Sequence, residues 1–214
     1  MKRSVAKISR GFFGVLVCLL IFASPLKAEP DNVLSREEAR TFIQTVYDRA
    51  LKLEAASTTL EPLAYNQALR ELVCGSLDVE ALSRFAAGNG LTKASDAERA
   101  EYRTLYIAWM MDIYQRYFIK AMGGRLNVAG SEAVPGSGDV YVKVALPGLF
   151  TPIYIDARVR RGQEGLGIID LSSSGVSLIK TQRDDFTAVI ERRGFEGLLM
   201  ELRRRVNVIT AEVR

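Results

Sequence analysis

Residues 153–171, IYIDARVRRGQEGLGIIDL, carry the clearest β pattern in the chain. Apolar side chains occupy every second position of its first half, at Ile153, Ile155, Ala157 and Val159. This alternation is typical of a strand with one buried face. A turn containing two glycines follows at 161–165, and an apolar run at 166–171 follows the turn. Strands joined by so short a turn pair antiparallel, so the stretch predicts a β-hairpin.

Further strand signals lie before this hairpin. Val140, Val142 and Val144 alternate with Tyr141 and Lys143. A Pro-Gly-Ser-Gly turn at 135–138 precedes them, and a short strand candidate at 125–129 precedes the turn. These signals predict one twisted antiparallel sheet of four to five strands.

Helical patterns flank the sheet on both sides. Ser35 with Glu38, and Ser95 with Glu98, form capping-box patterns at the start of two apolar-periodic segments. Helices are expected at about 35–50, 62–73, 78–88 and 95–121, with two more after the sheet that are divided at Gly194. Helices segregated from a sheet predict an α+β fold, with the helices packed over one sheet face.

The first 28 residues resemble an export signal. Basic residues precede an apolar run at 11–23, which is too short to span a bilayer as a helix, and a Ser-Pro pair ends that run. We expect a signal peptide at 1–28, cleaved after Ala28, and a single domain at 29–214; a retained membrane anchor is the alternative. The chain has 29 basic and 25 acidic residues, and loss of the five basic residues in 1–28 leaves a net charge near −1. The charge therefore gives no indication of nucleic acid as a partner.

The composition also limits the chemistry. The chain has no histidine, which excludes a Ser-His-Asp triad and histidine-ligated zinc. Cys74 is the lone cysteine outside the export segment, so we expect no internal disulfide and a buried thiol. Without a base to activate a serine, residues 172–175, Ser-Ser-Ser-Gly, are interpreted as a corner between strands rather than as a nucleophile loop.

Residues 77–199 carry a set of motifs in a fixed order. They are Leu77-Asp78-Val79-Glu80-Ala81-Leu82, Arg84-Phe85-Ala86, Gly88, Ser95-Asp96-Ala97-Glu98-Arg99, Asp170, Gly175-Val176-Ser177-Leu178, Arg183, Phe186 and Gly194-Phe195-Glu196-Gly197-Leu198-Leu199. Together they resemble the MlaC family of periplasmic phospholipid-binding proteins, over residues 77–202. Leu166, Ile169, Leu77 and Leu91 stand where the family has aromatic residues, so the positions stay apolar while their volume changes.

The resemblance implies a carrier without a cofactor and without enzymatic activity. It implies a monomer that takes phospholipid between the outer membrane and an inner-membrane ABC transporter, and so maintains outer-membrane lipid asymmetry. The implied partners are an inner-membrane MCE-domain protein and an outer-membrane lipoprotein–porin complex. A hopanoid-associated branch of the family is similar as well.

The resemblance also implies an apolar cavity between the sheet and the helices. The expected lipid-binding wall is Val142, Val144, Ile153, Ile155, Val159, Ile169 and Leu171 on the sheet, with Leu178, Met110, Met111, Ile113 and Tyr114 on the helical side or at the rim. The expected head-group rim is Tyr141, Tyr154 and Arg158. For any one of these residues ordinary core packing is the favoured interpretation, whereas for the set as a whole the resemblance favours a cavity wall.

Two other classes of function stay open from the residues alone. A small enzyme would need paired acids in an apolar pocket, for which Asp156 and Asp170 are the candidates on neighbouring strands. A scaffold without a ligand would dock through the arginine-rich stretch at 203–205.

Overall fold

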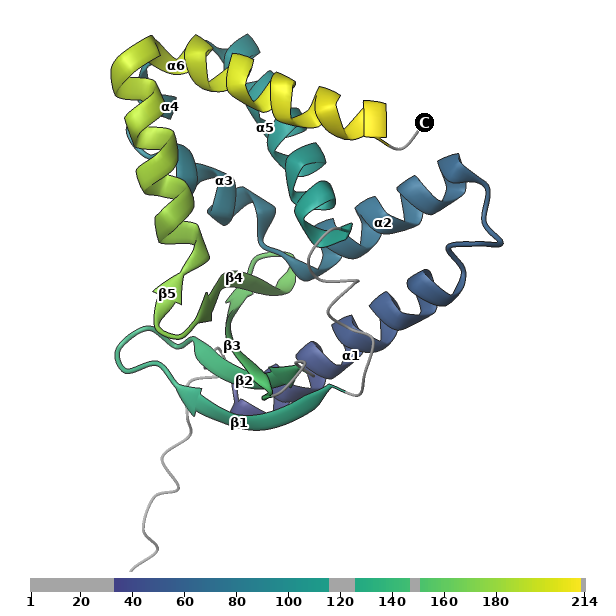
Figure 1. Cartoon of the computed structure of the whole chain (residues 1–214). Coiled ribbons are helices and arrows are strands. Elements are labelled where there is room, and N and C mark those ends of the chain that lie inside the picture. The colour runs from purple at the N-terminus through teal and green to yellow at the C-terminus, as the bar shows by residue number, and fades with distance from the viewer. Residues whose placement is uncertain (1–32, 116–125, 147–150, 213–214) are drawn as a thin grey trace, which may run out of the picture. The chain divides into compact units, whose positions relative to one another are not determined.

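The structure is a computed structural model that describes residues 33–115, 126–146 and 151–212, which belong to one compact unit. Five helices precede the sheet: α1 (Arg36–Ala55), α2 (Pro62–Ser76), α3 (Val79–Ala87), α4 (Gly90–Lys93) and α5 (Asp96–Ile113). The strands are β1 (Asn127–Ala133), β2 (Val140–Leu146), β3 (Ile153–Gly162), β4 (Gly165–Ser173) and β5 (Val176–Ser177). Helix α6 (Leu178–Glu212) ends the fold (Figure 1). The predicted α+β class and order of elements are confirmed.

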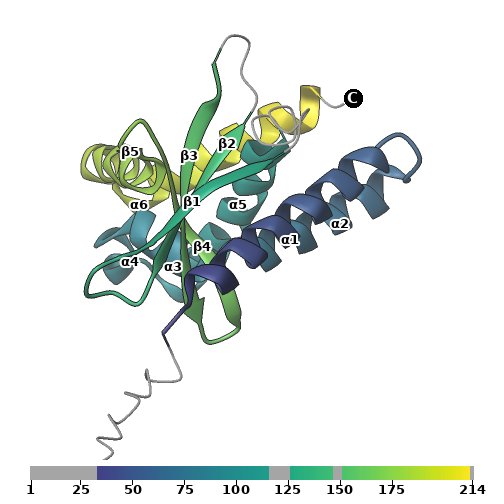
Figure 2. The same ribbon diagram turned by 90° about the horizontal axis from the view of Figure 1, so that it is seen from below.

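The five strands form one antiparallel sheet in chain order, β1-β2-β3-β4-β5 (Figure 1). Helices α1 and α2 lie side by side (Figure 2). In the β2–β3 pair, Val142 lies opposite Ala157 and Val144 lies opposite Ile155. Paired residues share a face, so the two alternating apolar patterns combine into one hydrocarbon surface. This surface faces α1 and the other helices, whereas Tyr141 and its neighbours on the opposite face contact solvent.

A β-bulge interrupts the β3–β4 pairing. Arg158 pairs with Asp170 but Val159 pairs with Ile168, so Ile169 is the extra residue in β4. A bulge shifts the alternation of one strand by one position. As a result, Ile168 and Leu171 both lie on the inner face although they are three residues apart.

The Ser-Ser-Ser-Gly stretch is the tight turn between β4 and β5. Ser174 and Gly175 have φ values of 52° and 80°, the two positive values that a type I′ hairpin turn requires. Asp170 lies just before the turn, and its Oδ1 accepts a hydrogen bond from the Ile179 backbone N–H at 3.3 Å. The interpretation of this stretch as a corner between strands is confirmed.

The helix boundaries follow their sequence signals. Both capping boxes form, with Ser35 at the start of α1 and Ser95 at the start of α5. Gly194 (φ 70°, ψ −178°) divides α6 into two helical segments, as its position in the sequence predicts. The expected extension of the long helix to residue 121 falls outside the described residues. Cys74 is exposed, so the prediction of a buried thiol is wrong.

Aromatic side chains join α5 to α6. Tyr102, Tyr106 and Trp109 of α5 contact Phe186 of α6, with ring centroids 5.4–6.5 Å apart. Next to Tyr102, Glu101 of α5 pairs with Arg203 of α6 at 2.6 Å. The two helices are therefore joined by both aromatic contacts and an ion pair.

A buried carboxylate lies at the start of β2. Asp139 is 1% exposed and accepts hydrogen bonds from Arg158 Nε at 2.7 Å and Arg160 Nε at 2.9 Å. Burial alone would raise the pKa of the Asp139 carboxyl, but the hydrogen bonds from Arg160 and Arg158 outweigh burial and hold this pKa below its usual value.

Replacing Asp139→Asn leaves two arginines without their acceptor charge. We expect the free energy of unfolding at pH 7 to fall by about 2–4 kcal/mol. Because the folded-state pKa is lowered, the carboxylate stabilises the fold above its unfolded pKa of about 3.9, and this contribution is lost as the pH falls through the folded-state value. Urea unfolding from pH 7 to pH 3 should therefore show the gap between the wild type and the variant closing below about pH 4.

Asp156→Asn is the matched control for this experiment. Asp156 pairs with Lys143 at 2.8 Å, but these side chains are 29% and 49% exposed. An exposed pair contributes less than about 1 kcal/mol. Equal losses for the two variants would contradict the assignment of Asp139 as the buried anchor.

Candidate functional site

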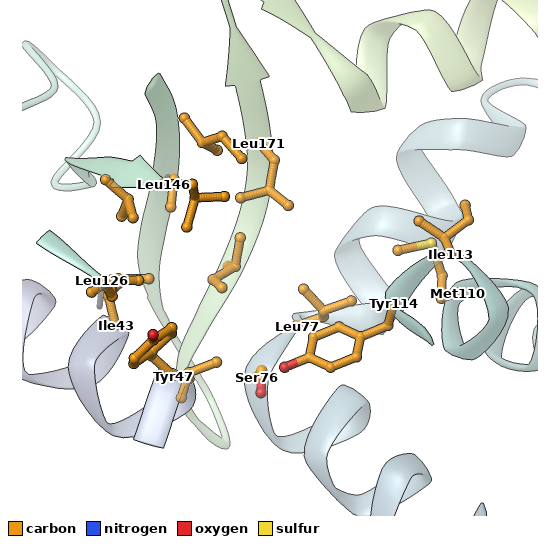
Figure 3. A pocket seen from close by; sticks show the side chains of 15 residues that line it. Ile43, Tyr47, Ser76, Leu77, Met110, Ile113, Tyr114, Leu126, Leu146 and Leu171 are labelled. Atoms are coloured by element: carbon orange, nitrogen blue, oxygen red, sulfur yellow. The ribbon is translucent and has the colours of Figure 1, made fainter. Parts of the chain in front are cut away.

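An apolar pocket lies between the inner face of the sheet and three helices (Figure 3). Its empty volume is about 780 Å³, including the space at its open side. The sheet side contributes Leu126, Val144, Leu146, Ile155, Ala157, Ile168 and Leu171. The helices contribute Ile43, Val46 and Tyr47 from α1, Ser76 and Leu77 at the end of α2, and Met110, Ile113 and Tyr114 at the end of α5.

Among the residues that the structure describes, the pocket wall carries no carboxylate or amine. The one non-aromatic polar residue among these is Ser76, whose hydroxyl donates to the Leu72 backbone carbonyl within α2. Burial raises the pKa of Tyr114 well above its ordinary value, so its phenol stays neutral at physiological pH. The surface offered to a ligand is therefore almost entirely hydrocarbon.

Six of the predicted wall residues line this pocket: Met110, Ile113, Tyr114, Val144, Ile155 and Leu171. Val142 and Val159 lie on the same sheet face but are fully buried in the core. Ile153 is 49% exposed at the start of β3, and Met111 packs against the core without lining the pocket. Leu178, 46% exposed, lines a smaller neighbouring pocket.

The structure replaces Ile169 with Ile168 as the wall residue. In a regular strand, residues two apart share a face, so Leu171 on the inner face predicts Ile169 on that face too. The bulge makes Ile169 an extra residue and brings Ile168 to the inner face instead. Ile168 is 7% exposed and lines the pocket, whereas Ile169 is partly exposed. The expectation for Ile169 was wrong because a bulge leaves no mark in a hydrophobic pattern.

The predicted head-group rim lies on the other side of the sheet. Tyr141 pairs with Arg158, and Tyr154 pairs with Ala145, at positions that alternate with the pocket-lining residues. Arg158 binds the buried Asp139, and Tyr141 lines a polar groove with Lys143 and Asp156. These three residues are therefore not at the mouth of the apolar pocket, because the alternation of a strand separates its two faces.

The pattern analysis did not single out several wall residues. On the sheet they are Leu126, Leu146, Ala157 and Ile168, and on the helices they are Ile43, Val46, Tyr47, Ser76 and Leu77. Leu146 and Ala157 extend the same strand alternation, which was a sufficient signal. The α1 residues form an ordinary amphipathic stripe. Such a stripe does not reveal whether it packs against other side chains in the core or lines a pocket.

The acids proposed for an alternative enzyme do not form a site. Asp156 lines the polar outer groove and pairs with Lys143, while Asp170 lines the smaller inner pocket and accepts from Ile179 N–H. Among the described residues, no group of three acidic, cysteine or histidine side chains is arranged to hold a metal ion. Within the same residues, no helix has the length and hydropathy needed to cross a bilayer.

The arginines proposed for docking by a scaffold are bound within the fold. Arg203 contacts Glu101 and Glu196, and Arg204 and Arg205 both contact Glu201. These contacts hold α6 together and attach it to α5.

Together, the fold and the pocket define an α+β domain with a neutral hydrocarbon pocket between an antiparallel sheet and its covering helices. A model of the MlaC protein family matches residues 42–204, so the chain belongs to the MlaC family. No curated protein sequence matches the chain.

Solved structures share the fold, and seven chains match. One is a phospholipid-binding protein from Ralstonia solanacearum in complex with a phospholipid. It is 18% identical, with a TM-score of 0.66, and the match covers 82% of this chain and 98% of that chain.

Alanine substitutions at Ile168 and Ile169 test the bulge. We expect Ile168→Ala to lower the free energy of unfolding by about 2–4 kcal/mol, because it removes buried methyl groups, and Ile169→Ala to lower it by less than about 1.5 kcal/mol. Chemical denaturation of the two variants measures the difference. A larger loss at Ile169 than at Ile168 would show that the strand pairs without the bulge.

Proposed function

We propose that this chain is a periplasmic phospholipid-binding carrier that moves lipid between the outer membrane and an inner-membrane ABC transporter. The observation that carries the proposal is the neutral hydrocarbon pocket between the sheet and helices α1, α2 and α5. Membership of the MlaC family supports it, as does the shared fold with a protein whose structure contains a phospholipid.

Transfer energetics explain why such a carrier needs no energy source of its own. Each methylene group that leaves an apolar environment for water costs about 0.8 kcal/mol. A diacyl lipid with roughly thirty such groups therefore costs on the order of 20 kcal/mol to expose. A pocket as apolar as the bilayer removes most of this cost, so lipid can enter and leave without a large change in free energy.

The proposal extends to export and to partners. Residues 1–28 would direct export and be removed, leaving 29–214 as the lipid-binding domain in the periplasm. The domain would then receive or deliver lipid at an inner-membrane MCE-domain protein and at an outer-membrane lipoprotein–porin complex. A hopanoid is the second candidate cargo, because a rigid hydrocarbon would meet the same neutral wall.

Filling the pocket tests the cargo site. Ile155→Trp adds an aromatic ring at the centre of the sheet wall, and we expect the amount of phospholipid that co-purifies with the mature protein to fall at least fivefold. Mass spectrometry of organic extracts measures the amount. Val176→Trp is the control, because Val176 is 60% exposed and lies outside both inner pockets. Equal lipid content in Ile155→Trp and wild type would remove the pocket as the cargo site.

Export gives an independent test. The protein recovered from a periplasmic fraction should begin at Glu29, which intact-mass measurement detects directly. A full-length mass, with the protein held in the membrane fraction, would instead support a retained anchor.

A further inference from the structure

A second, smaller pocket lies directly beside the apolar pocket. Its empty volume is about 380 Å³, including the space at its open side. It shares five wall residues with the larger pocket: Leu77, Met110, Ile113, Ile168 and Leu171. The two spaces are therefore neighbouring compartments of one interior. The smaller compartment extends towards the start of α6, where Leu178 is both a wall residue and 46% exposed.

The smaller compartment differs from the larger one in its polar groups. Tyr106, Gln182 and Asp170 contribute to its wall among otherwise apolar side chains. Tyr106 is fully buried, and its hydroxyl donates a hydrogen bond to Gln182 Oε1 at 3.0 Å. Burial raises the pKa of Tyr106, so this hydroxyl stays protonated and remains a donor.

Among the described residues, the amide nitrogen of Gln182 has only a weak hydrogen-bond partner. Gln182 Nε2 lies 3.9 Å from Met110 Sδ, and a thioether is a poor hydrogen-bond acceptor. Reversing the amide would place Nε2 against the Tyr106 oxygen and leave the Tyr106 hydroxyl proton without an acceptor among the described residues. The favoured orientation therefore directs an underused N–H donor at a residue that lines both compartments.

The charge at this end of the interior limits what the donor can bind. Asp170 lines the same compartment, and its carboxylate already accepts the hydrogen bond from Ile179 N–H. A second negative charge placed here, such as a phosphate group, would be repelled by Asp170. A neutral oxygen carries no such penalty.

We propose that Gln182 donates a hydrogen bond to a neutral oxygen of the bound lipid, and that Tyr106 is the positioning residue that orients the amide. The oxygen is an ester carbonyl of a glycerolipid or a hydroxyl group carried on a chain, since both present the same acceptor chemistry. The inference rests on the proposed function. A hydrogen bond from Gln182 would let the protein discriminate between lipids whose hydrocarbon chains have the same length. When a bound lipid has no oxygen next to Gln182, the amide nitrogen keeps only its weak contact with the Met110 thioether, so that lipid binds less tightly.

A matched pair of lipids tests the proposal. Dipalmitoyl-phosphatidylcholine and its dihexadecyl ether analogue have the same head group and chain length, but the ether lipid lacks both carbonyl groups. We expect delipidated wild-type mature protein to bind the ester lipid about five- to tenfold more tightly. In Gln182→Leu the ratio of the two affinities should fall to about one. In Tyr106→Phe the Gln182 amide loses the hydroxyl that orients it and can rotate, so the ratio should take an intermediate value.

Thr187→Val on the exposed side of α6 is the control, and it should keep the wild-type ratio. Because each ratio compares two lipids on one protein, a general loss of stability in a variant cancels from it. A third lipid, an ether phosphatidylcholine with a hydroxylated chain, separates the two sources of oxygen. Tighter binding of this lipid that is lost in Gln182→Leu would support the proposal and assign the oxygen to the chain.

Two results overturn the inference in distinguishable ways. If the wild type binds the ester, ether and hydroxylated lipids equally, or if Gln182→Leu keeps the wild-type preference, Gln182 makes no such contact while the carrier function stands. If the wild type binds none of the three, the proposed function fails and the inference fails with it.

Discussion

The pocket depends on how the aromatic contacts between α5 and α6 hold the helical layer above the sheet. Tyr106 and Trp109 pack on Phe186, and α5 takes its main packing contacts from α6, α2 and α3 rather than from the strands. Helix α1, in contrast, packs on β1 and β2. The two walls thus belong to different packing units, and the end of α5 faces the sheet across a space that neither unit fills. Well-packed interiors leave few voids larger than a water molecule, so an apolar space of this size is a feature that the packing must maintain.

The same arrangement separates charge from hydrocarbon. Strands β2 and β3 place Lys143, Asp156 and Arg158 on the outer face, where Lys143 pairs with Asp156 and Arg158 pairs with the buried Asp139. The residues of these two strands that line the larger pocket are all apolar. Ion pairs at the far end of α5, such as Glu101 with Arg203, stabilise the helical layer without entering the pocket. Residues 29–214, whose formal net charge is near −1, in this way combine an uncharged wall in the larger pocket with ion pairs on the outer surface.

The sequence was sufficient for the sheet, the helix caps and the corner at Gly175 because each depends on local chemistry. Alternation gave the inner face of β2 and β3, and capping boxes gave the starts of α1 and α5. Ile169 was predicted on the wrong face because the bulge arises from the pairing of β4 with β3, and the sequence of β4 alone does not reveal that pairing. Tyr154 and Arg158 were assigned to a rim by residue type alone, although their alternation with Ile155 already put them on the opposite face. Tyr47 of α1 was missed because only the tertiary packing decides whether a helical stripe meets a core or a hollow.

Under the proposed carrier function, a neutral pocket also constrains how the bound lipid is released. The described wall of the larger compartment contains no carboxylate or amine whose titration would expel a lipid, and burial keeps the Tyr114 phenol neutral. Hydrophobic transfer is non-directional and depends on apolar area, so this compartment gives affinity without discriminating between head groups. Discrimination requires a directional contact, and in the smaller compartment the Gln182 amide, fixed by Tyr106, supplies one. Release to an acceptor then requires only that the acceptor offer equivalent hydrocarbon surface and an equivalent donor for the same oxygen.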